Sequence, residues 1–135
     1  MRLALVVSRF NPEVTMPMRD LAVRRAEAKG AEVVSIVEVP GTMEVPLALD
    51  RLLSHDDIDG AVVLGAVIQG ETRHDEVIVH AVAAEVARIS VKRGKPVGFG
   101  ITGPGMTLEQ AEARVGYAER AVDAAVQMHA LLSQA

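Results

Sequence analysis

The stretch Gly60-Ala-Val-Val-Leu-Gly-Ala-Val-Ile-Gln-Gly-Glu-Thr-Arg-His-Asp-Glu76 decides the fold of this chain. Residues 61–68 form an almost unbroken apolar run, which is typical of a strand buried on both faces of a parallel sheet. Gly70 breaks the run, and Thr72 can cap a helix that continues to about Arg93. Open α/β sheets bind ligands where a parallel strand feeds a helix N-terminus, and the exposed amides there suit an anion such as phosphate.

Strands and helices alternate on both sides of this stretch. Strands are predicted at residues 3–7, 32–39, 61–68 and 94–101, and helices at about 13–29, 42–53, 72–93 and from 107 onward. Residues 102–105 are predicted to form a tight loop. The alternation indicates an α/β, flavodoxin-like three-layer sandwich with a four-stranded parallel sheet in the order 2-1-3-4. Because no repeat or linker interrupts the pattern, we expect residues 1–135 to form a single domain.

The composition narrows the possible classes of protein. Half of the 135 residues are hydrophobic, which argues against disorder, and the net charge of −4 gives no support for binding of nucleic acid. No apolar run is long enough to span a membrane, and the N-terminal apolar segment is too short for a signal peptide. The chain has no cysteine, which excludes disulfides and thiol chemistry and fits a cytoplasmic location.

The loops after the four strands, at residues 8–12, 40–44, 69–74 and 99–106, should meet at one edge of the sheet. His74 follows the central strand beside the anion-competent amides, so we interpret it as a proton-transfer group rather than a solvated polar residue. Phe10 precedes Pro12 in a loop, where its ring would either stack on a flat heterocycle or plug the edge of the sheet. Phe99 lies between two glycines, which favours core packing but also permits close approach of a ligand.

Other polar residues give weaker signals. The amides of residues 42–44 could bind a polyol, with Glu44 accepting hydrogen bonds from hydroxyls, or Glu44 could merely complement the helix dipole. Arg114 is a surface arginine unless an anion pairs with it. His74 and His80 fall on different faces of one helix, and no group of His, Asp and Glu has the spacing of metal ligands, so no metal site is expected.

Four motifs occur in order along the chain: Ser8-Arg-Phe-Asn11, Val39-Pro-Gly-Thr-Met-Glu-Val-Pro46, Gly65-Ala-Val-Ile-Gln-Gly-Glu-Thr-Arg-His74, and Pro96-Val-Gly-Phe-Gly100 with Arg114 downstream. Together they resemble the 6,7-dimethyl-8-ribityllumazine synthase family, and the later Gly-Ile-Thr-Gly-Pro-Gly-Met-Thr107 resembles its archaeal branch. The resemblance implies a transferase of riboflavin biosynthesis. This enzyme would condense 5-amino-6-(D-ribitylamino)uracil with 3,4-dihydroxy-2-butanone 4-phosphate to give the lumazine, phosphate and water, with no metal or cofactor.

The resemblance also assigns the ribitylaminouracil site, motif by motif. Phe10 would stack on the pyrimidine ring, and Phe99 would close the ring pocket from a neighbouring subunit. The ribityl chain and ring edge would contact Thr42, Met43 and Glu44. The pyrimidine site would be lined by the backbone of Ala66, Val67 and Ile68.

For the second substrate, the resemblance implies that Glu71 and Thr72 bind the phosphate through helix-terminal amides. Arg114, from a neighbouring subunit, would pair with the same phosphate, and His74 would transfer protons. The family forms homo-oligomers, either pentamers or assemblies of pentamers, with sites between subunits. Many members carry an acidic residue just before this arginine and a lysine four positions after it; this chain has Ala113 and Ala118 there.

Three alternatives stay open on the sequence alone. An archaeal-type riboflavin synthase would use lumazine itself as the substrate. A flavodoxin-like or receiver-like binding module would share the fold, although a receiver needs an acidic cluster after its first strand, where this chain has Ser8 and Arg9. A purely structural shell protein would assemble without turnover.

Overall fold

The computed structural model describes residues 1–70 and 74–135. Its centre is a four-stranded parallel sheet in the order β2-β1-β3-β4, which confirms the predicted fold class and strand order. The strands are β1 (Arg2–Ser8), β2 (Glu32–Val39), β3 (Gly60–Ile68) and β4 (Val97–Met106). The helices are α1 (Pro12–Ala28), the 3-10 turn η1 (Thr42–Glu44), α2 (Val45–Leu53), α3 (His74–Arg93), α4 (Leu108–Ala113) and α5 (Tyr117–Ser133).

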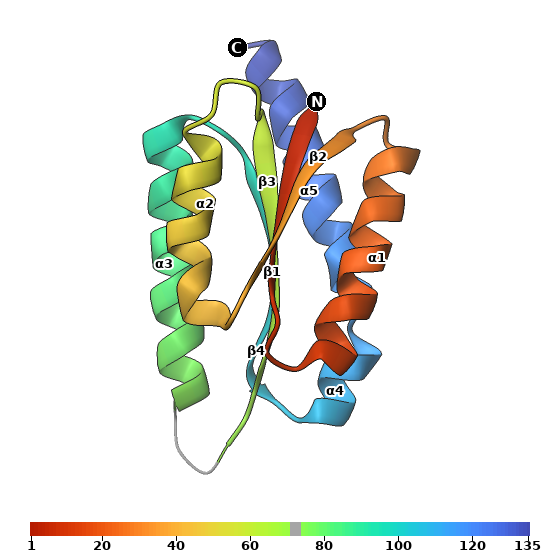
Figure 1. Cartoon of the computed structure of the whole chain (residues 1–135), viewed down its shortest axis with the longest axis vertical. Helices are drawn as coiled ribbons and strands as arrows, with labels where there is room; N and C mark the ends of the chain where they lie inside the picture. The colour runs from red at the N-terminus through yellow and green to blue at the C-terminus, as the bar shows by residue number, and fades with distance from the viewer. Residues whose placement is uncertain (71–73) are drawn as a thin grey trace.

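Helices cover both faces of the sheet (Figure 1): α2 and α3 lie on one side, and α1, α4 and α5 lie on the other. Successive side chains of a strand point to opposite faces, so β1 contributes Leu3 and Leu5 to one apolar cluster and Ala4 and Val6 to the other. The central strand β3 is buried from Gly60 to Val67. Two filled cores explain why its sequence shows a continuous apolar run rather than an alternation.

The edge strand β4 packs very closely on α5. A Cβ atom at Gly98 would overlap the backbone carbonyl of Ala121, so only glycine fits at this position. Because side chains alternate along a strand, Phe99 points to the opposite face, where it is 38% exposed at the edge of the sheet. Phe99 pairs with Val63, in the middle of β3.

The end of β4 differs from the prediction. Residues 102–105 do not form a loop that ends the strand, because Ala66 pairs with Thr102 and Ile68 then pairs with Met106. Residues 103–105 therefore bulge opposite the single residue Val67. The pairing resumes because the backbone at the end of β3 gains a partner, with the Gln69 N–H donating to the Met106 carbonyl at 2.7 Å. The glycines that indicated a loop supply the left-handed backbone of the bulge instead.

The C-terminal helical region, predicted from residue 107 onward, is interrupted. Helix α4 ends at Ala113 and α5 begins at Tyr117. A capping box starts α4: the Gln110 N–H donates to the Thr107 hydroxyl at 3.2 Å, and the Thr107 N–H donates to the Gln110 side chain at 3.0 Å. Within the described residues, none of the helices is both long enough and apolar enough to cross a membrane.

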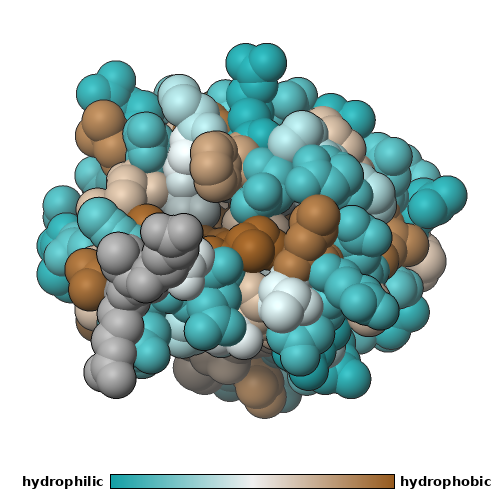
Figure 2. All heavy atoms as spheres, turned by 90° about the horizontal axis from the view of Figure 1, so that it is seen from below, coloured by the Kyte–Doolittle hydropathy of each residue, from teal (hydrophilic) through white to brown (hydrophobic). Residues whose placement is uncertain are grey.

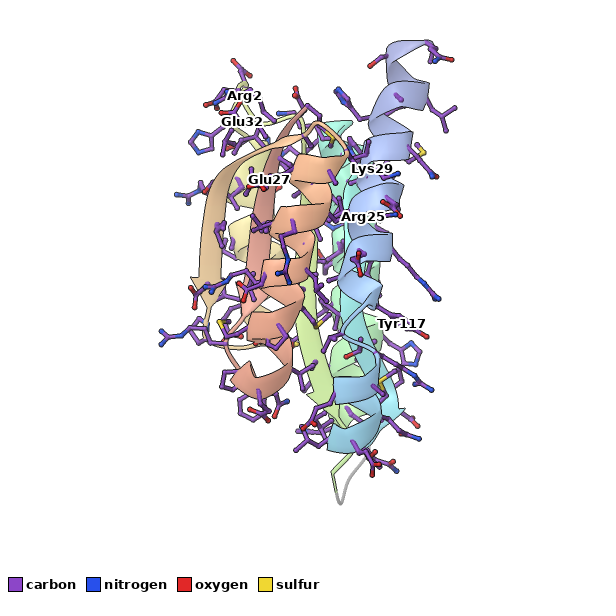
Figure 3. The ribbon with its side chains drawn as sticks, turned by 90° about the vertical axis from the view of Figure 1, so that its right-hand side faces the viewer. Arg2, Arg25, Glu27, Lys29, Glu32 and Tyr117 are labelled. Atoms are coloured by element: carbon purple, nitrogen blue, oxygen red, sulfur yellow. The ribbon has the colours of Figure 1, made fainter. Side chains whose placement is uncertain are left out.

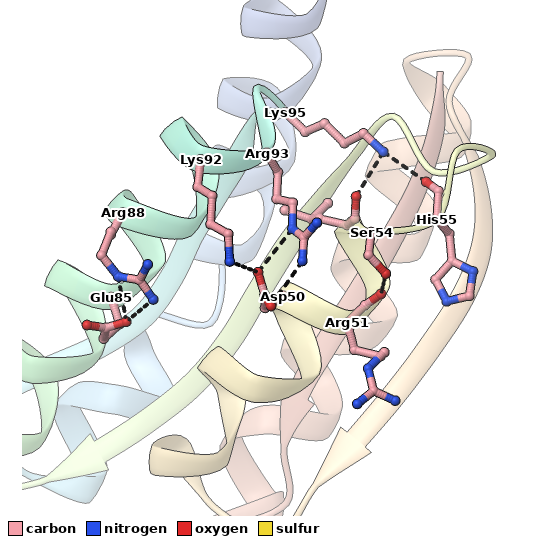
Figure 4. Close-up of polar contacts among 10 residues, drawn as sticks. Asp50, Arg51, Ser54, His55, Glu85, Arg88, Lys92, Arg93 and Lys95 are labelled. Carbon is pink, nitrogen blue, oxygen red and sulfur yellow. Dashed lines mark hydrogen bonds and ion pairs between the residues drawn. The ribbon is translucent and has the colours of Figure 1, made fainter.

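Helices α2 and α3 are joined at their C-terminal ends (Figure 4). The Arg93 guanidinium donates from Nε and Nη2 to the two carboxylate oxygens of Asp50, each at 3.1 Å. Lys95 Nζ continues this contact by donating to the carbonyls of Leu53 at 2.9 Å and His55 at 2.8 Å. The hydrogen bonds from Arg93 hold the pKa of Asp50 below its usual range. These contacts thus join the two helices at the ends that lie away from the carboxyl edge of the sheet, where both helices begin.

A second ion pair joins α1 to α5 on the other face of the sheet. Arg25 donates from Nε and Nη2 to the two oxygens of Asp123, each at 2.8 Å. Figure 3 shows Arg25 of α1 lying toward α5. The hydrogen bonds from Arg25 lower the pKa of Asp123. A bidentate ion pair of this kind stabilises the contact between the two helices and also fixes their relative position.

Candidate active site

A cavity of about 400 Å³ lies at the carboxyl ends of β1, β2 and β3. Figure 2 looks onto this edge of the molecule, where apolar atoms gather near the middle and are surrounded by hydrophilic ones. The cavity lies where the loop after β1, the η1 turn, the end of β3 and the start of α3 meet, as expected for a parallel sheet. Its lining residues are Phe10, Gly41, Thr42, Met43, Glu44, Ala66, Val67, Ile68, Gly70, His74, Asp75 and Ile78.

Three motifs that lie far apart in the sequence therefore meet at one cavity. Phe10, residues 42–44 and residues 66–68 all line it, together with His74. The Phe10 side chain is 69% exposed. A ring that sealed the edge of the sheet would be buried, so this exposure favours the open stacking surface over the plug.

Asn11 fixes the loop that carries Phe10. Its backbone lies in the left-handed region, with φ of 62°, which asparagine tolerates better than most residues. Its side-chain Nδ2 donates to the Ala66 carbonyl at 2.9 Å. The Ser8–Asn11 motif includes this residue, but we predicted no role for it. The sequence did contain one signal of its role, because Asn11 directly precedes Pro12 at the start of a helix.

The η1 turn presents its residues at different depths. Thr42 is 8% exposed, and its hydroxyl lies 3.4 Å from where a Cβ of Gly65 would be, so it is the deepest part of this wall. Met43 and Glu44 are exposed at the cavity mouth. A carboxylate at the mouth is accessible to the hydroxyl groups of a bound polyol, and Thr42 beneath it supplies a further polar group.

Helix α3 begins at the cavity with two adjacent polar residues that differ in burial. His74 is exposed, whereas Asp75 is only 5% exposed. Asp75 Oδ2 accepts a hydrogen bond of 2.8 Å from the Gly105 backbone N–H, which belongs to the bulge of β4. Asp75 is not among the predicted site residues. Acidic residues are common in the first turn of a helix, where they complement the helix dipole, so the sequence contains no signal of this contact.

Two predicted site residues lie away from this cavity. Phe99 lines a separate hollow of about 340 Å³ between α3 and β4, together with Val86, Val91 and Val97. Arg114 is the exposed residue at the C-terminal end of α4. Neither residue reaches the cavity of its own subunit. Glu71 and Thr72, predicted to bind phosphate, lie outside the described residues.

Over residues 1–70 and 74–135, no group of three or more His, Asp or Glu side chains is placed to hold a metal ion. The polar groups that the cavity offers are hydroxyl, carboxylate, imidazole and backbone amide groups. These groups can bind hydroxyls and heterocycle edges and can move protons.

Comparison with known proteins identifies the family to which this chain belongs. The family profile of 6,7-dimethyl-8-ribityllumazine synthase matches residues 1–133. The chain belongs to the lumazine synthase family. Relatives named 6,7-dimethyl-8-ribityllumazine synthase include one from Methanopyrus kandleri, 53% identical over 94% of this chain and 90% of the relative. One from Metallosphaera sedula is 52% identical over 94% of this chain and 85% of the relative. One from Methanocaldococcus jannaschii is 47% identical over 93% of this chain and 89% of the relative.

Membership in the lumazine synthase family confirms the resemblance inferred from the four motifs, including its archaeal character. It makes the chain a transferase that acts in riboflavin biosynthesis. The binding-module and shell-protein alternatives are therefore set aside.

Proposed function

We propose that the chain condenses 5-amino-6-(D-ribitylamino)uracil with 3,4-dihydroxy-2-butanone 4-phosphate in the cavity at the carboxyl edge of the sheet. The products are 6,7-dimethyl-8-ribityllumazine, inorganic phosphate and water. The observation that carries this proposal is the meeting of Phe10, Glu44 and His74 around one cavity of about 400 Å³. That volume is of the size that small-molecule sites usually have.

The ribitylaminouracil would bind with its ring against Phe10. The exposed ring of Phe10 offers a flat apolar face for stacking, and residues 66–68 form an apolar floor. Glu44 accepts hydrogen bonds from the ribityl hydroxyls at the cavity mouth, and Thr42 and Met43 complete this wall. This arrangement gives one end of the substrate an aromatic contact and the other end a polar one.

His74 would serve as the proton-transfer residue. Imine formation between the amine and the ketone, loss of phosphate and ring closure each require a proton to be moved, and an imidazole can both accept and donate one near neutral pH. Both reactants are intrinsically reactive, so holding them together supplies much of the acceleration. A stacking surface, a polyol contact and a phosphate contact are the parts that such positioning needs.

The butanone phosphate would bind beside the start of α3. We propose that Glu71 and Thr72 contribute backbone amides, with the Glu71 carboxylate directed away from the anion. Arg114 would pair with the phosphate from a neighbouring subunit. Ala113 and Ala118 replace the acidic residue and the lysine that many members carry near this arginine.

The same proposal includes a homo-oligomer, either a pentamer or an assembly of pentamers, of single-domain chains in the cytoplasm. Support comes from the surface around Phe99, where the Val91 side chain is 83% exposed beside the partly exposed ring. A neighbouring subunit on this surface would cover both side chains. Phe99 and Arg114 would then complete a site in the adjacent chain.

The deciding experiment is an absorbance and fluorescence assay of the purified protein with both substrates. Lumazine formation that requires both substrates is the expected result, with phosphate released in equal amount. A second incubation contains lumazine alone. Riboflavin formation there, without condensation in the first assay, would overturn the proposal in favour of a riboflavin synthase.

A further inference from the structure

The bulge of β4 lies on the face of the sheet that α3 covers. A Cβ at Gly103 would lie 2.7 Å from the Val67 carbonyl and 3.4 Å from a methyl group of Val79 in α3. Two residues later, Gly105 has a φ of +77° and directs its N–H to Asp75. Residues 103–105 are thus packed against the same helix that carries His74.

Asp75 is a buried carboxylate with a defined donor. Burial of a charged carboxylate is costly unless hydrogen bonds replace its lost water. The Gly105 N–H at 2.8 Å supplies such a bond, and the positive end of α3 also favours the charge. The contact spans 30 positions of sequence and joins the first turn of α3 to the end of β4.

We infer that Asp75 is a positioning residue that, through the Gly105 amide, holds the first turn of α3 and therefore His74 in the reactive geometry. This inference rests on the proposed function and deepens it. Asp75 and His74 are consecutive, so a shift of the first turn displaces both side chains. Shifts of about 1 Å in the placement of a reacting group can reduce rates strongly.

The neighbouring residue Glu76 provides a matched control. Glu76 is exposed and belongs to the same first turn, so Glu76→Ala removes one negative charge near the helix N-terminus without removing a buried contact. Asp75→Ala removes both the charge and the acceptor. Asp75→Asn removes the charge but keeps a side-chain oxygen that can accept the Gly105 hydrogen bond.

The test measures kcat and both KM values for the three variants and the wild type. Asp75→Ala should lower kcat roughly tenfold or more, in line with loss of a hydrogen bond to a charged acceptor. Its KM for ribitylaminouracil should change by less than about threefold, because the stacking and ribityl contacts are untouched. Asp75→Asn and Glu76→Ala should each keep kcat within about threefold of the wild type.

Hydrogen exchange at the Gly105 amide reports the contact independently of activity. This amide should be protected in the wild type and in Asp75→Asn, and should exchange faster in Asp75→Ala. An unprotected amide in the wild type overturns the inference, even if Asp75→Ala fails to fold. So does Asp75→Ala with wild-type kcat, or Asp75→Asn as impaired as Asp75→Ala. A wild type that forms no lumazine overturns the proposed function and the positioning role together; an active wild type confines any failure to the role of Asp75.

Discussion

The side-chain amide of Asn11 donates a hydrogen bond to the Ala66 carbonyl at 2.9 Å, across 55 positions of sequence. This bond joins the loop after β1 to the end of β3 and so fixes the residue before it, Phe10, at the cavity. Because Asn11 also has a positive φ, it holds this loop both by its conformation and by its side chain.

Substitution of Asn11 separates these two contributions. Asn11→Gly keeps the left-handed backbone but removes the hydrogen bond. Asn11→Ala removes the hydrogen bond and also disfavours the left-handed backbone. We expect KM for ribitylaminouracil to rise roughly 3- to 10-fold in Asn11→Gly and further in Asn11→Ala, since a neutral hydrogen bond contributes about 1 kcal/mol. Steady-state kinetics measure the change. Equal KM values in Asn11→Gly and the wild type would show that the bond does not position Phe10.

Replacement of His74 by alanine should mainly affect the chemical step. We expect kcat to fall roughly 10²- to 10⁴-fold, the range usual for loss of an acid–base group, with the assembly unchanged. His80→Ala is the control, because His80 is exposed on the same helix and does not line the cavity. Rapid-mixing kinetics and sedimentation provide the two measurements. A His74→Ala enzyme with undiminished kcat would remove His74 from the mechanism.

The proposal that Arg114 acts in the neighbouring subunit's site can be tested by mixing variants. His74→Ala and Arg114→Ala homo-oligomers should each be impaired, the second mainly through a raised KM for butanone phosphate. Co-assembly of the two in equal amounts should restore roughly one quarter of the sites to wild type if the ring interface is heterologous. Activity is compared before and after dissociation and reassembly. No recovery, with mixed oligomers verified by mass, would place both residues in the same subunit's site.

The Asp50–Arg93 pair should make stability depend on pH. Arg93 lowers the folded-state pKa of Asp50, so the stabilisation is complete above the unfolded-state pKa of about 3.9 and is lost as the pH falls through the lower folded-state value. Urea unfolding of Asp50→Asn should show lower stability than the wild type at pH 7, and the difference should shrink below about pH 4. A double-mutant cycle with Arg93→Gln tests the pair itself. Additive effects in that cycle would argue that the two residues are not coupled.

Gly98 should tolerate no side chain. Gly98→Ala forces α5 away from β4, because the added Cβ would overlap the Ala121 carbonyl. We expect a loss of about 2 kcal/mol or more in the free energy of unfolding, typical of a core overpacked against backbone. Gly70→Ala is the control, since none of the residues that the structure describes lies within 4 Å of its added Cβ. Chemical denaturation measures both variants, and similar losses in the two would contradict the packing argument.

The position of Phe99 shows how far sequence reasoning reached. The Gly-Pro-Gly segment predicted a loop, which placed Phe99 near the carboxyl ends of the strands. In the structure β4 continues to Met106, and Phe99 pairs with Val63. Val63 lies four residues before Val67 on β3, roughly 13 Å along the strand. No local signal distinguishes a loop from a bulge at residues 103–105, because both use glycines with positive φ.

The sequence by itself determined the order of the strands and which loops meet at the ligand edge. Hydrophobic runs and helix periodicity are local properties, and helical crossovers between strands make the strands parallel, which brings every carboxyl end to the same side. Only the tertiary structure decided the contacts of Asn11 with Ala66 and of Asp75 with Gly105. Each joins residues at least 30 positions apart, so its existence depends on strand register and helix packing, which no local pattern encodes.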